Sequence, residues 1–119
     1  EQEITGDRTE GEFAREVKHL VAPWTVGASE LWMGISVIDP GSASNPHRHE
    51  RQEEAFFCLS GSGLIKVGEQ TFEIRRGSCV FVRPGMTHQL INTSADEVLR
   101  VLGATAPPFN REGWTDVHE

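Results

Sequence analysis

The sequence predicts an all-β domain, either a sandwich or a barrel of antiparallel strands. From residue 30 onward, strand-length apolar runs recur about every eight to twelve residues and alternate with turn sequences rich in Gly, Pro, Asp and Ser. The same stretch shows almost none of the periodicity of an amphipathic helix. At 119 residues, the chain is long enough for one domain with a core and too short for two.

The N-terminal part is expected to precede the barrel as an arm, with residues 1–25 as the arm and 26–119 as the barrel domain. Thr9 and Glu12 have the spacing of a capping box, which would open a short helix reaching Val17. Gly11 weakens that helix, and an extended arm is the alternative.

The next segment, Arg15–Trp24, alternates apolar and polar residues at period two until Pro23 interrupts it, which is typical of an edge strand. His19 lies in this segment, far in sequence from the other histidines, and a surface or arm position is expected for it. The strands expected after it span Leu31–Ile38, Ala55–Leu59, Leu64–Val67, Thr71–Arg75, Ser78–Val82, His88–Asn92 and Val98–Ala104. The third and fourth are expected to form a hairpin around Gly68-Glu69-Gln70, and Pro107 opens a tail that contains Trp114.

Composition and charge exclude several classes of partner. The formal net charge of −7 makes nucleic acid and anionic membranes unfavourable partners. No apolar run approaches the roughly 18 residues needed to span a bilayer, and no signal-like leader is seen, so the cytoplasm is the predicted location. Cys58 and Cys79 both lie in apolar stretches, which predicts two buried free thiols rather than a disulfide.

Metal-ligand residue types gather in two places. His47 and His49 are two residues apart, so in an extended segment both side chains project to one face. Glu54 has the opposite parity and shares that face only if a turn intervenes, for which the polar run of residues 50–52 gives room. His88 follows the Pro84-Gly85 turn and would begin its own strand. Three strand ends converging at one barrel mouth would place three imidazoles and one carboxylate around a cation.

The spacings of these residues resemble the two sequence motifs of the cupin superfamily. Gly41 is followed by five residues, His47-x-His49, four residues, Glu54, six residues and Gly61; the second motif is similar to Gly77, Gly85, two residues, His88, three residues and Asn92. The family usually has Pro two positions before the second Gly of that motif, where this chain has Arg83, with Pro84 one place later. The resemblance covers residues 41–92. It implies a double-stranded β-helix, or jelly-roll barrel, of the small single-domain, conserved-barrel type.

The resemblance implies that His47, His49, Glu54 and His88 are metal ligands. Glu53 is the competing carboxylate, expected to face solvent or Arg48. Three imidazoles and one carboxylate suit Fe, Mn, Ni, Zn or Cu better than Mg or Ca, and they leave coordination positions open.

Parity also predicts which residues line the pocket behind the metal. The candidates are apolar or lie beside the ligands: Trp32, Met33, Phe56, Cys58, Leu90 and Asn92. One alternating set within Leu31–Ile38 would face inward, either Trp32, Gly34 and Ser36 or Leu31, Met33 and Ile35. Asn92 would bond a ligand residue or satisfy a turn backbone. Cys58 is not expected to act as a nucleophile, because nothing near it in sequence would lower its pKa.

Cupins include enzymes and proteins that only bind, so the reaction class is open. The chain has no Tyr, which counts against branches that use a tyrosine as acid or base, and no independent catalytic base is identified. These features favour an enzyme whose metal does most of the chemistry, with a small organic molecule as substrate and dioxygenase chemistry as the leading hypothesis. An isomerase or cyclase acting on a sugar or polyketide-like substrate, and a non-catalytic small-molecule binder, are the alternatives. Single-domain cupins pair through their N-terminal strands, which implies a homodimer here.

Overall fold

The all-β prediction is confirmed. A computed structural model describes residues 6–108, and within them it contains nine strands, one 3₁₀ turn and no α-helix. The elements are β1 (Asp7–Thr9), η1 (Gly11–Phe13), β2 (Arg15–Val21), β3 (Trp32–Ile38), β4 (Glu53–Ser60), β5 (Ser62–Val67), β6 (Gln70–Arg75), β7 (Cys79–Val82), β8 (His88–Asn92) and β9 (Leu99–Ala106). No helix in this part of the chain is long and apolar enough to cross a membrane. The predicted tail with Trp114 lies outside the described residues.

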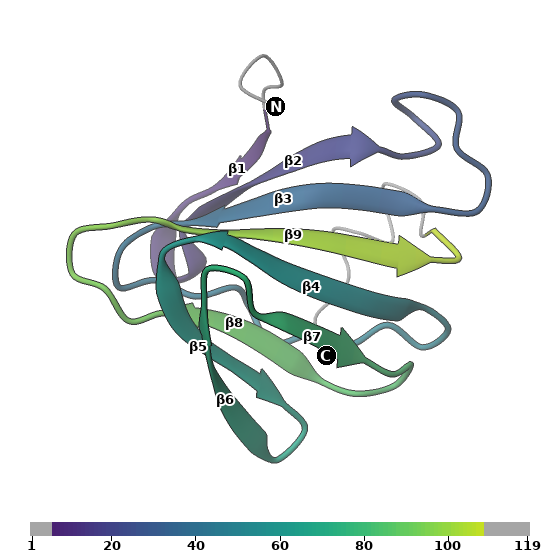
Figure 1. The fold of residues 1–119 in the computed structure, drawn as a ribbon. Coiled ribbons are helices and arrows are strands. Elements are labelled where there is room, and N and C mark those ends of the chain that lie inside the picture. Colours follow the sequence, from purple (N-terminus) through teal and green to yellow (C-terminus); the bar gives the residue numbers. More distant parts are fainter. Residues whose placement is uncertain (1–5, 109–119) are drawn as a thin grey trace.

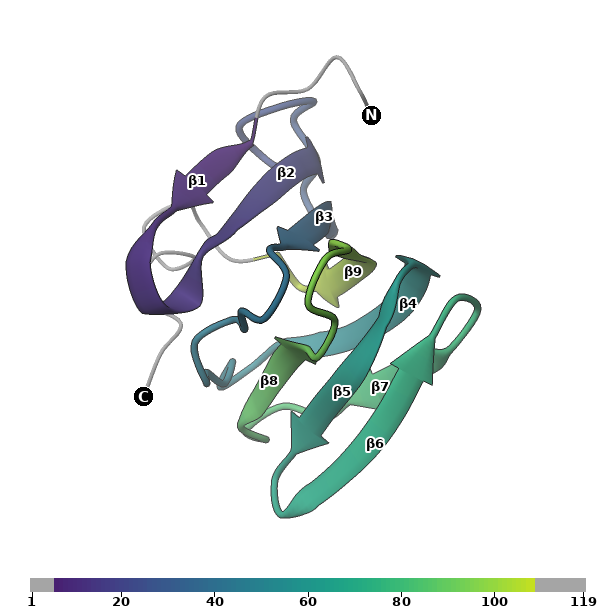
Figure 2. The same ribbon diagram turned by 90° about the vertical axis from the view of Figure 1, so that its left-hand side faces the viewer.

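Two antiparallel sheets face each other across the core (Figure 1). The larger sheet has the strand order β1-β2-β3-β9-β4-β7 and the smaller one β6-β5-β8. Most neighbours are far apart in sequence, so the chain crosses repeatedly between the sheets, as in a jelly roll. The turned view in Figure 2 shows β5, β6 and β8 forming a separate layer beneath β4 and β9.

The core lies between the sheets because the strands alternate inward apolar and outward polar residues. On β4, for example, Glu54, Phe56 and Cys58 are buried and the residues between them are exposed. The main cluster contains Ile38, Phe56, Cys58, Ile65, Val67, Ile74, Val82, Leu90, Leu99 and Val101. The predicted β5–β6 hairpin is present, with Val67 opposite Gln70 and Gly68 at a φ of 59° in the two-residue turn.

The N-terminal arm is extended and forms two outer strands of the larger sheet. β2 pairs along β3, and β1 pairs with the first half of β2. The alternative of a helix reaching Val17 is not realised, because only the 3₁₀ turn at Gly11–Phe13 forms before β2 begins. Pairing with β3 and burial of Val17 prevail over the local capping signal.

His19 lies in the arm, which is one of its two expected positions, but it is buried there, so the expected surface position is wrong. Its ring is 7% exposed, with Nδ1 accepting a hydrogen bond of 3.0 Å from Trp32 Nε1 and Nε2 lying 3.0 Å from Asp7 Oδ2. The ring faces inward because it shares the face of Arg15 and Val17 on β2. The arm therefore helps to position Trp32.

The two cysteines are free, but only Cys58 is buried. Cys79 is exposed because it occupies an outward position of β7, opposite the half-exposed Phe57 of β4. The prediction of a buried thiol is therefore wrong for Cys79. Burial raises the pKa of the Cys58 thiol, which makes it a poor nucleophile.

Candidate metal centre

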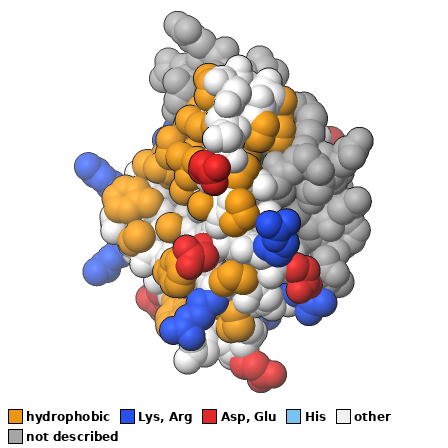
Figure 3. All heavy atoms as spheres, turned by 90° about the vertical axis from the view of Figure 1, so that its right-hand side faces the viewer, with side chains coloured by type: hydrophobic (Ala, Val, Ile, Leu, Met, Phe, Trp, Pro, Cys, Tyr) orange, Lys and Arg blue, Asp and Glu red, His pale blue; other side chains and the backbone are white. Residues whose placement is uncertain are grey.

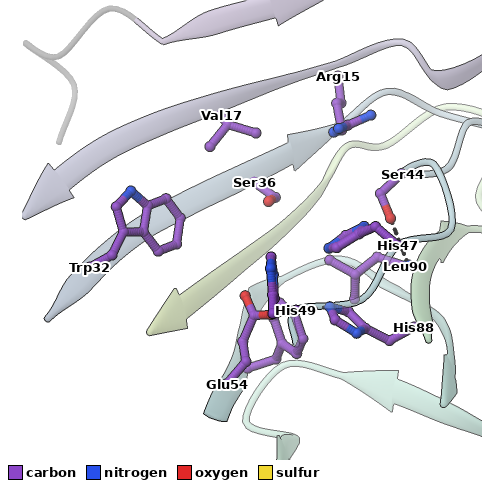
Figure 4. Close-up of a pocket in the computed structure, with 11 residues that line it drawn as sticks. Arg15, Val17, Trp32, Ser36, Ser44, His47, His49, Glu54, His88 and Leu90 are labelled. Atoms are coloured by element: carbon purple, nitrogen blue, oxygen red, sulfur yellow. Dashed lines mark hydrogen bonds and ion pairs between the residues drawn. The ribbon is translucent and has the colours of Figure 1, made fainter. Parts of the chain in front are cut away.

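The structure brings His47, His49, Glu54 and His88 together in the space between the two sheets. One ligand-type atom from each residue lies within 4.8 Å of the other three. The imidazole rings of His47 and His88 are 4.3 Å apart between centroids, and the His49 ring is 5.2 Å and 5.6 Å from them. Figure 4 shows the four side chains converging from different segments of the chain.

Residues 42–47 bring His47 to this place by running alongside β8. His47 and His88 form an isolated antiparallel bridge, with His47 N–H donating to His88 O at 3.1 Å and the reverse bond at 2.8 Å. Ser44 bonds Leu90 through both its backbone N–H and its side-chain oxygen, each at 2.9 Å. Two sequence motifs that are far apart are thus joined by backbone pairing.

The turn before β8 joins the motifs a second time. Arg83-Pro84-Gly85-Met86 is closed by a bond of 3.3 Å from Met86 N–H to Arg83 O, with Gly85 at a φ of 84°. A type II turn requires a positive φ at its third position, which Gly adopts without strain. Gly85 N–H also donates to His49 O at 2.8 Å. The displaced Pro84 therefore fits this turn as its second residue.

Backbone carbonyls fix the tautomers of two histidines. His47 Nδ1 lies 2.8 Å from Asn45 O, and His88 Nδ1 lies 3.0 Å from Met86 O. Because a carbonyl oxygen only accepts, each Nδ1 carries a proton, and Nε2 is the ring nitrogen that faces the cluster. This is the arrangement in which metal-binding histidines are usually held.

The carboxylate that reaches the histidines is Glu54, which is 6% exposed, whereas Glu53 faces solvent. Glu54 Oε1 is 3.2 Å from His49 Nε2 and 3.1 Å from His88 Nε2. Despite these distances, Glu54 Oε1 and His88 Nε2 are buried and make no aligned hydrogen bond in the described structure. Buried polar atoms rarely lack a partner.

The four residues fit a transition metal. Two ligand atoms on opposite sides of one ion at about 2.1 Å each lie about 4.2 Å apart, so the cluster needs to contract by less than about 1 Å. A bound cation would also satisfy the two unpartnered atoms, since both would be directed at it. The donor set of three imidazoles and one carboxylate suits Fe, Mn, Ni, Zn or Cu.

The electrostatics leave the cluster ready for a cation at neutral pH. Burial, followed by the nearby His88, lowers the pKa of His47 to about 3, so its ring is neutral. Burial alone would raise the pKa of Glu54, but the close imidazoles of His49 and His88 outweigh it and hold that pKa below its usual range. Glu54 is therefore ionised and supplies the negative charge that a metal needs.

A cavity of about 40 Å³ adjoins the cluster. Three of the six predicted pocket residues line it, namely Trp32, Phe56 and Leu90. Ser36 also lines it, so the alternating set of β3 that contains Trp32 and Ser36 faces the cavity and the set that contains Met33 does not. The volume has room for about three water molecules, so a ligand that fits it as it stands is small.

The remaining predicted pocket residues, Met33, Cys58 and Asn92, lie elsewhere. Met33 is half-buried on the other face of β3, and Cys58 belongs to the main core cluster. Asn92 is 2% exposed and satisfies backbone groups: its Nδ2 lies 2.8–3.1 Å from the carbonyl oxygens of Ile38, Asp39 and Glu97. The expectation for Asn92 is either to bond a ligand residue or to satisfy the backbone of a turn, and the structure shows the second role.

Sequence reasoning missed Arg15, Val17 and Ser44, which also line the cavity. The period-two pattern of β2 places Arg15 and Val17 on one face, and this signal could have directed attention to them. The sequence leaves open whether Arg48, Arg83 or Arg100 reaches an acidic ligand. Arg48 and Arg83 are exposed, with Arg48 pairing with Glu50 at 2.7 Å, and the half-buried Arg100 is not among the residues that line the cavity. Of the arginines in residues 6–108, it is Arg15 that lines the cavity.

Comparisons with known proteins agree with this geometry. A family model described as "Cupin domain" matches residues 34–103, which include all four residues of the cluster. An uncharacterized protein of Streptomyces coelicolor is 37% identical over 64% of this chain and 70% of its own length. The polyketide synthase CurC of Streptomyces cyaneus is 27% identical over 84% of this chain and 63% of its own length. The crystal structure of a predicted oxalate decarboxylase from Thermotoga maritima superposes with a TM-score of 0.79 at 24% identity, over 89% of this chain and 95% of that one.

Proposed function

This chain belongs to the cupin family, and we propose that it is a metal-dependent enzyme acting on a small organic molecule at a site held by His47, His49, Glu54 and His88. One observation carries the proposal. Glu54 Oε1 and His88 Nε2 are buried, 3.1 Å apart and without aligned hydrogen bonds in the described part of the chain, beside two more imidazoles. Such an arrangement is unfavourable without a cation and favourable with one.

The residues of the site divide the work between them. The carbonyls of Asn45 and Met86 hold the rings of His47 and His88 in one tautomer. The carboxylate of Glu54 would neutralise part of the positive charge of a bound metal ion. The apolar lining of Trp32, Phe56 and Leu90 limits the access of water. A transition metal bound here would supply Lewis acidity or reactivity toward dioxygen.

Dioxygenase chemistry is the leading candidate because, among residues 6–108, no independent acid–base residue lines the cavity. Apart from the four proposed ligands, the titratable residue that lines it is Arg15, which stays protonated at neutral pH. Chemistry that needs a separate side chain to remove a proton is therefore less well supported than chemistry that the metal supplies.

We expect oxygen uptake when the protein, loaded in turn with Fe(II), Mn(II) or Ni(II), is mixed with a panel of enols, catechols, diketones and short oxygenated acids. An oxygen electrode measures the rate, and mass spectrometry with labelled dioxygen shows whether both atoms enter the product. The Glu54→Gln variant is the matched control and should show no uptake above that of free metal. If no member of the panel causes uptake while metal is bound, the oxygenase assignment is wrong.

An isomerase or cyclase is the second candidate, because a relative is named a polyketide synthase. The same assays separate the possibilities: a cyclase or isomerase converts its substrate without consuming oxygen, and a binding protein changes neither. The cavity of about 40 Å³ favours a small substrate over an extended polyketide chain.

We also propose that the protein forms a homodimer through its N-terminal strands. β1 is at one edge of the larger sheet, and it covers only the first half of β2. Exposed strand edges tend to pair with other chains. Figure 3 shows hydrophobic side chains on one face of the molecule, but the exposed large hydrophobic residues of the described chain lie outside β1 and β2, so the dimer proposal rests on the strand edge alone.

Multi-angle light scattering across a range of protein concentrations is expected to give a mass twice that of the chain. A mass of one chain at all concentrations would refute the dimer.

A cytoplasmic location is proposed from the cysteines. Cys58 and Cys79 are both free, and Cys79 is exposed. An exposed thiol persists most readily in a reducing compartment. Cell fractionation with an antibody to the protein would test this.

A further inference from the structure

Arg15, the first residue of β2, is a buried cation whose side-chain partners are a backbone carbonyl and an amide oxygen rather than a carboxylate. It is 8% exposed, and its guanidinium donates to Phe13 O at 3.3 Å and to Asn45 Oδ1 at 2.8 Å. No carboxylate of residues 6–108 forms an ion pair with it. A guanidinium has five N–H donors, so three of them are left over after these two bonds. A buried charge without a counter-ion is costly, and such groups usually have a functional role.

The guanidinium is held in a fixed place relative to the metal ligands. Asn45 connects the two: its side-chain oxygen accepts from Arg15 Nη2, and its backbone carbonyl accepts from His47 Nδ1. The second bond, to Phe13 O, fixes Arg15 from the other direction. Figure 4 shows Arg15 approaching the cavity from β2, on the side opposite Glu54. The remaining donors are thus available to a ligand in the cavity that Arg15 and the four ligands share.

The charge of the cavity favours an anion. Among the described residues that line the cavity, Arg15 and Glu54 carry charged side chains of opposite sign, and they lie on opposite sides of it. A divalent metal at the four ligands would then leave the cavity with excess positive charge. An anionic ligand would compensate it, and a carboxylate matches the planar fork of a guanidinium.

We infer that the cavity binds a short-chain carboxylic acid, whose carboxylate is received by Arg15 while a second oxygen of the molecule faces His47, His49, Glu54 and His88. The small volume of about 40 Å³ favours a short-chain acid over a longer one. The inference rests on the proposed function for the role of the second oxygen. Recognition of the carboxylate by Arg15 is tested separately.

The test compares carboxylates with their neutral amides. Glycolate, pyruvate and oxalate are titrated against glycolamide, pyruvamide and oxamide by calorimetry, with metal-loaded and with chelator-treated protein. The variants are Arg15→Gln, which removes the charge, and Arg15→Lys, which keeps the charge but removes the fork. Lys18→Gln is the matched control, because it removes a cation from the same strand at a position that does not line the cavity. The metal content of every sample is measured in parallel.

We expect wild-type protein and Lys18→Gln to prefer at least one carboxylate over its amide, with Arg15→Gln weakening carboxylate binding roughly 10- to 100-fold. Arg15→Lys should fall between them, and all three variants should keep their metal.

The inference is overturned if wild-type protein binds the amides equally well, or if Arg15→Gln leaves the preference intact; retained metal would then leave the proposed function standing. Absence of metal from wild-type protein would contradict the proposed function instead, while the chelator-treated series still decides on Arg15. If Arg15→Gln does not fold, the role of Arg15 is decided by wild-type protein and Arg15→Lys. The preference for carboxylate over amide should then be weaker in Arg15→Lys than in wild-type protein.

Discussion

Replacing Glu54 by Ala is expected to abolish stoichiometric metal binding, and so is replacing His49 by Ala. Each substitution removes one of four atoms that lie within 4.8 Å of one another, and no other described side chain is placed in the cluster to take over. Changes to the groups that merely support a metal ligand typically cost 10- to 100-fold in affinity, so loss of a ligand should cost more than about 100-fold. Elemental analysis of the purified proteins measures the result as ions per chain.

Glu53→Ala is the matched control for this experiment. Glu53 is adjacent to Glu54 on β4 and carries the same charge, but it faces solvent on the other side of the strand. This variant should retain the metal content of the wild-type protein. Undiminished metal in Glu54→Ala, or equal losses in the two glutamate variants, would disprove the proposed ligand set.

The choice of Glu54 over Glu53 comes from the spacing of the cupin motif, because parity with His47 and His49 alone would favour Glu53 and residues 55–59 are apolar on both faces. Alternation along a strand establishes only that the two glutamates lie on opposite faces. The same reasoning located most strands, since each is a short alternating run between turn residues. It also named Trp32, Phe56 and Leu90 as pocket residues, together with Met33, Cys58 and Asn92, which do not line the cavity.

The part of the site that could not be predicted depends on pairing between distant strands. Arg15 reaches the cavity only because β2 pairs with β3 and Asn45 holds its guanidinium from a loop 30 residues away. Nothing in the local pattern connects these two residues. The inward position of His19 and the outward position of Cys79 are likewise consequences of sheet assembly.

Asn92 also shows that a local motif does not reveal contacts between distant strands. Its spacing from His88 predicts a place in the pocket, but its side chain bonds the backbone that joins the two sheets. The side chain comes from β8 of the smaller sheet and bonds Ile38 O at the end of β3 in the larger sheet. It also bonds Asp39 O and Glu97 O, and its Oδ1 accepts from Ser94 N–H at 2.9 Å. One buried amide therefore joins both sheets to the loop between β8 and β9.

Asn92→Ala is accordingly expected to lower the free energy of unfolding by about 3 to 5 kcal/mol, because it leaves several buried backbone groups without partners. For a domain of this size the melting temperature should fall by roughly 10 to 20 °C, as measured by calorimetry or circular dichroism. Thr93→Ala, at the exposed neighbouring position, is the control and should melt close to wild type. Folded Asn92→Ala protein should still bind metal with wild-type stoichiometry. A variant that melts normally but loses metal would instead place Asn92 in direct support of the metal ligands and overturn its assignment to the framework.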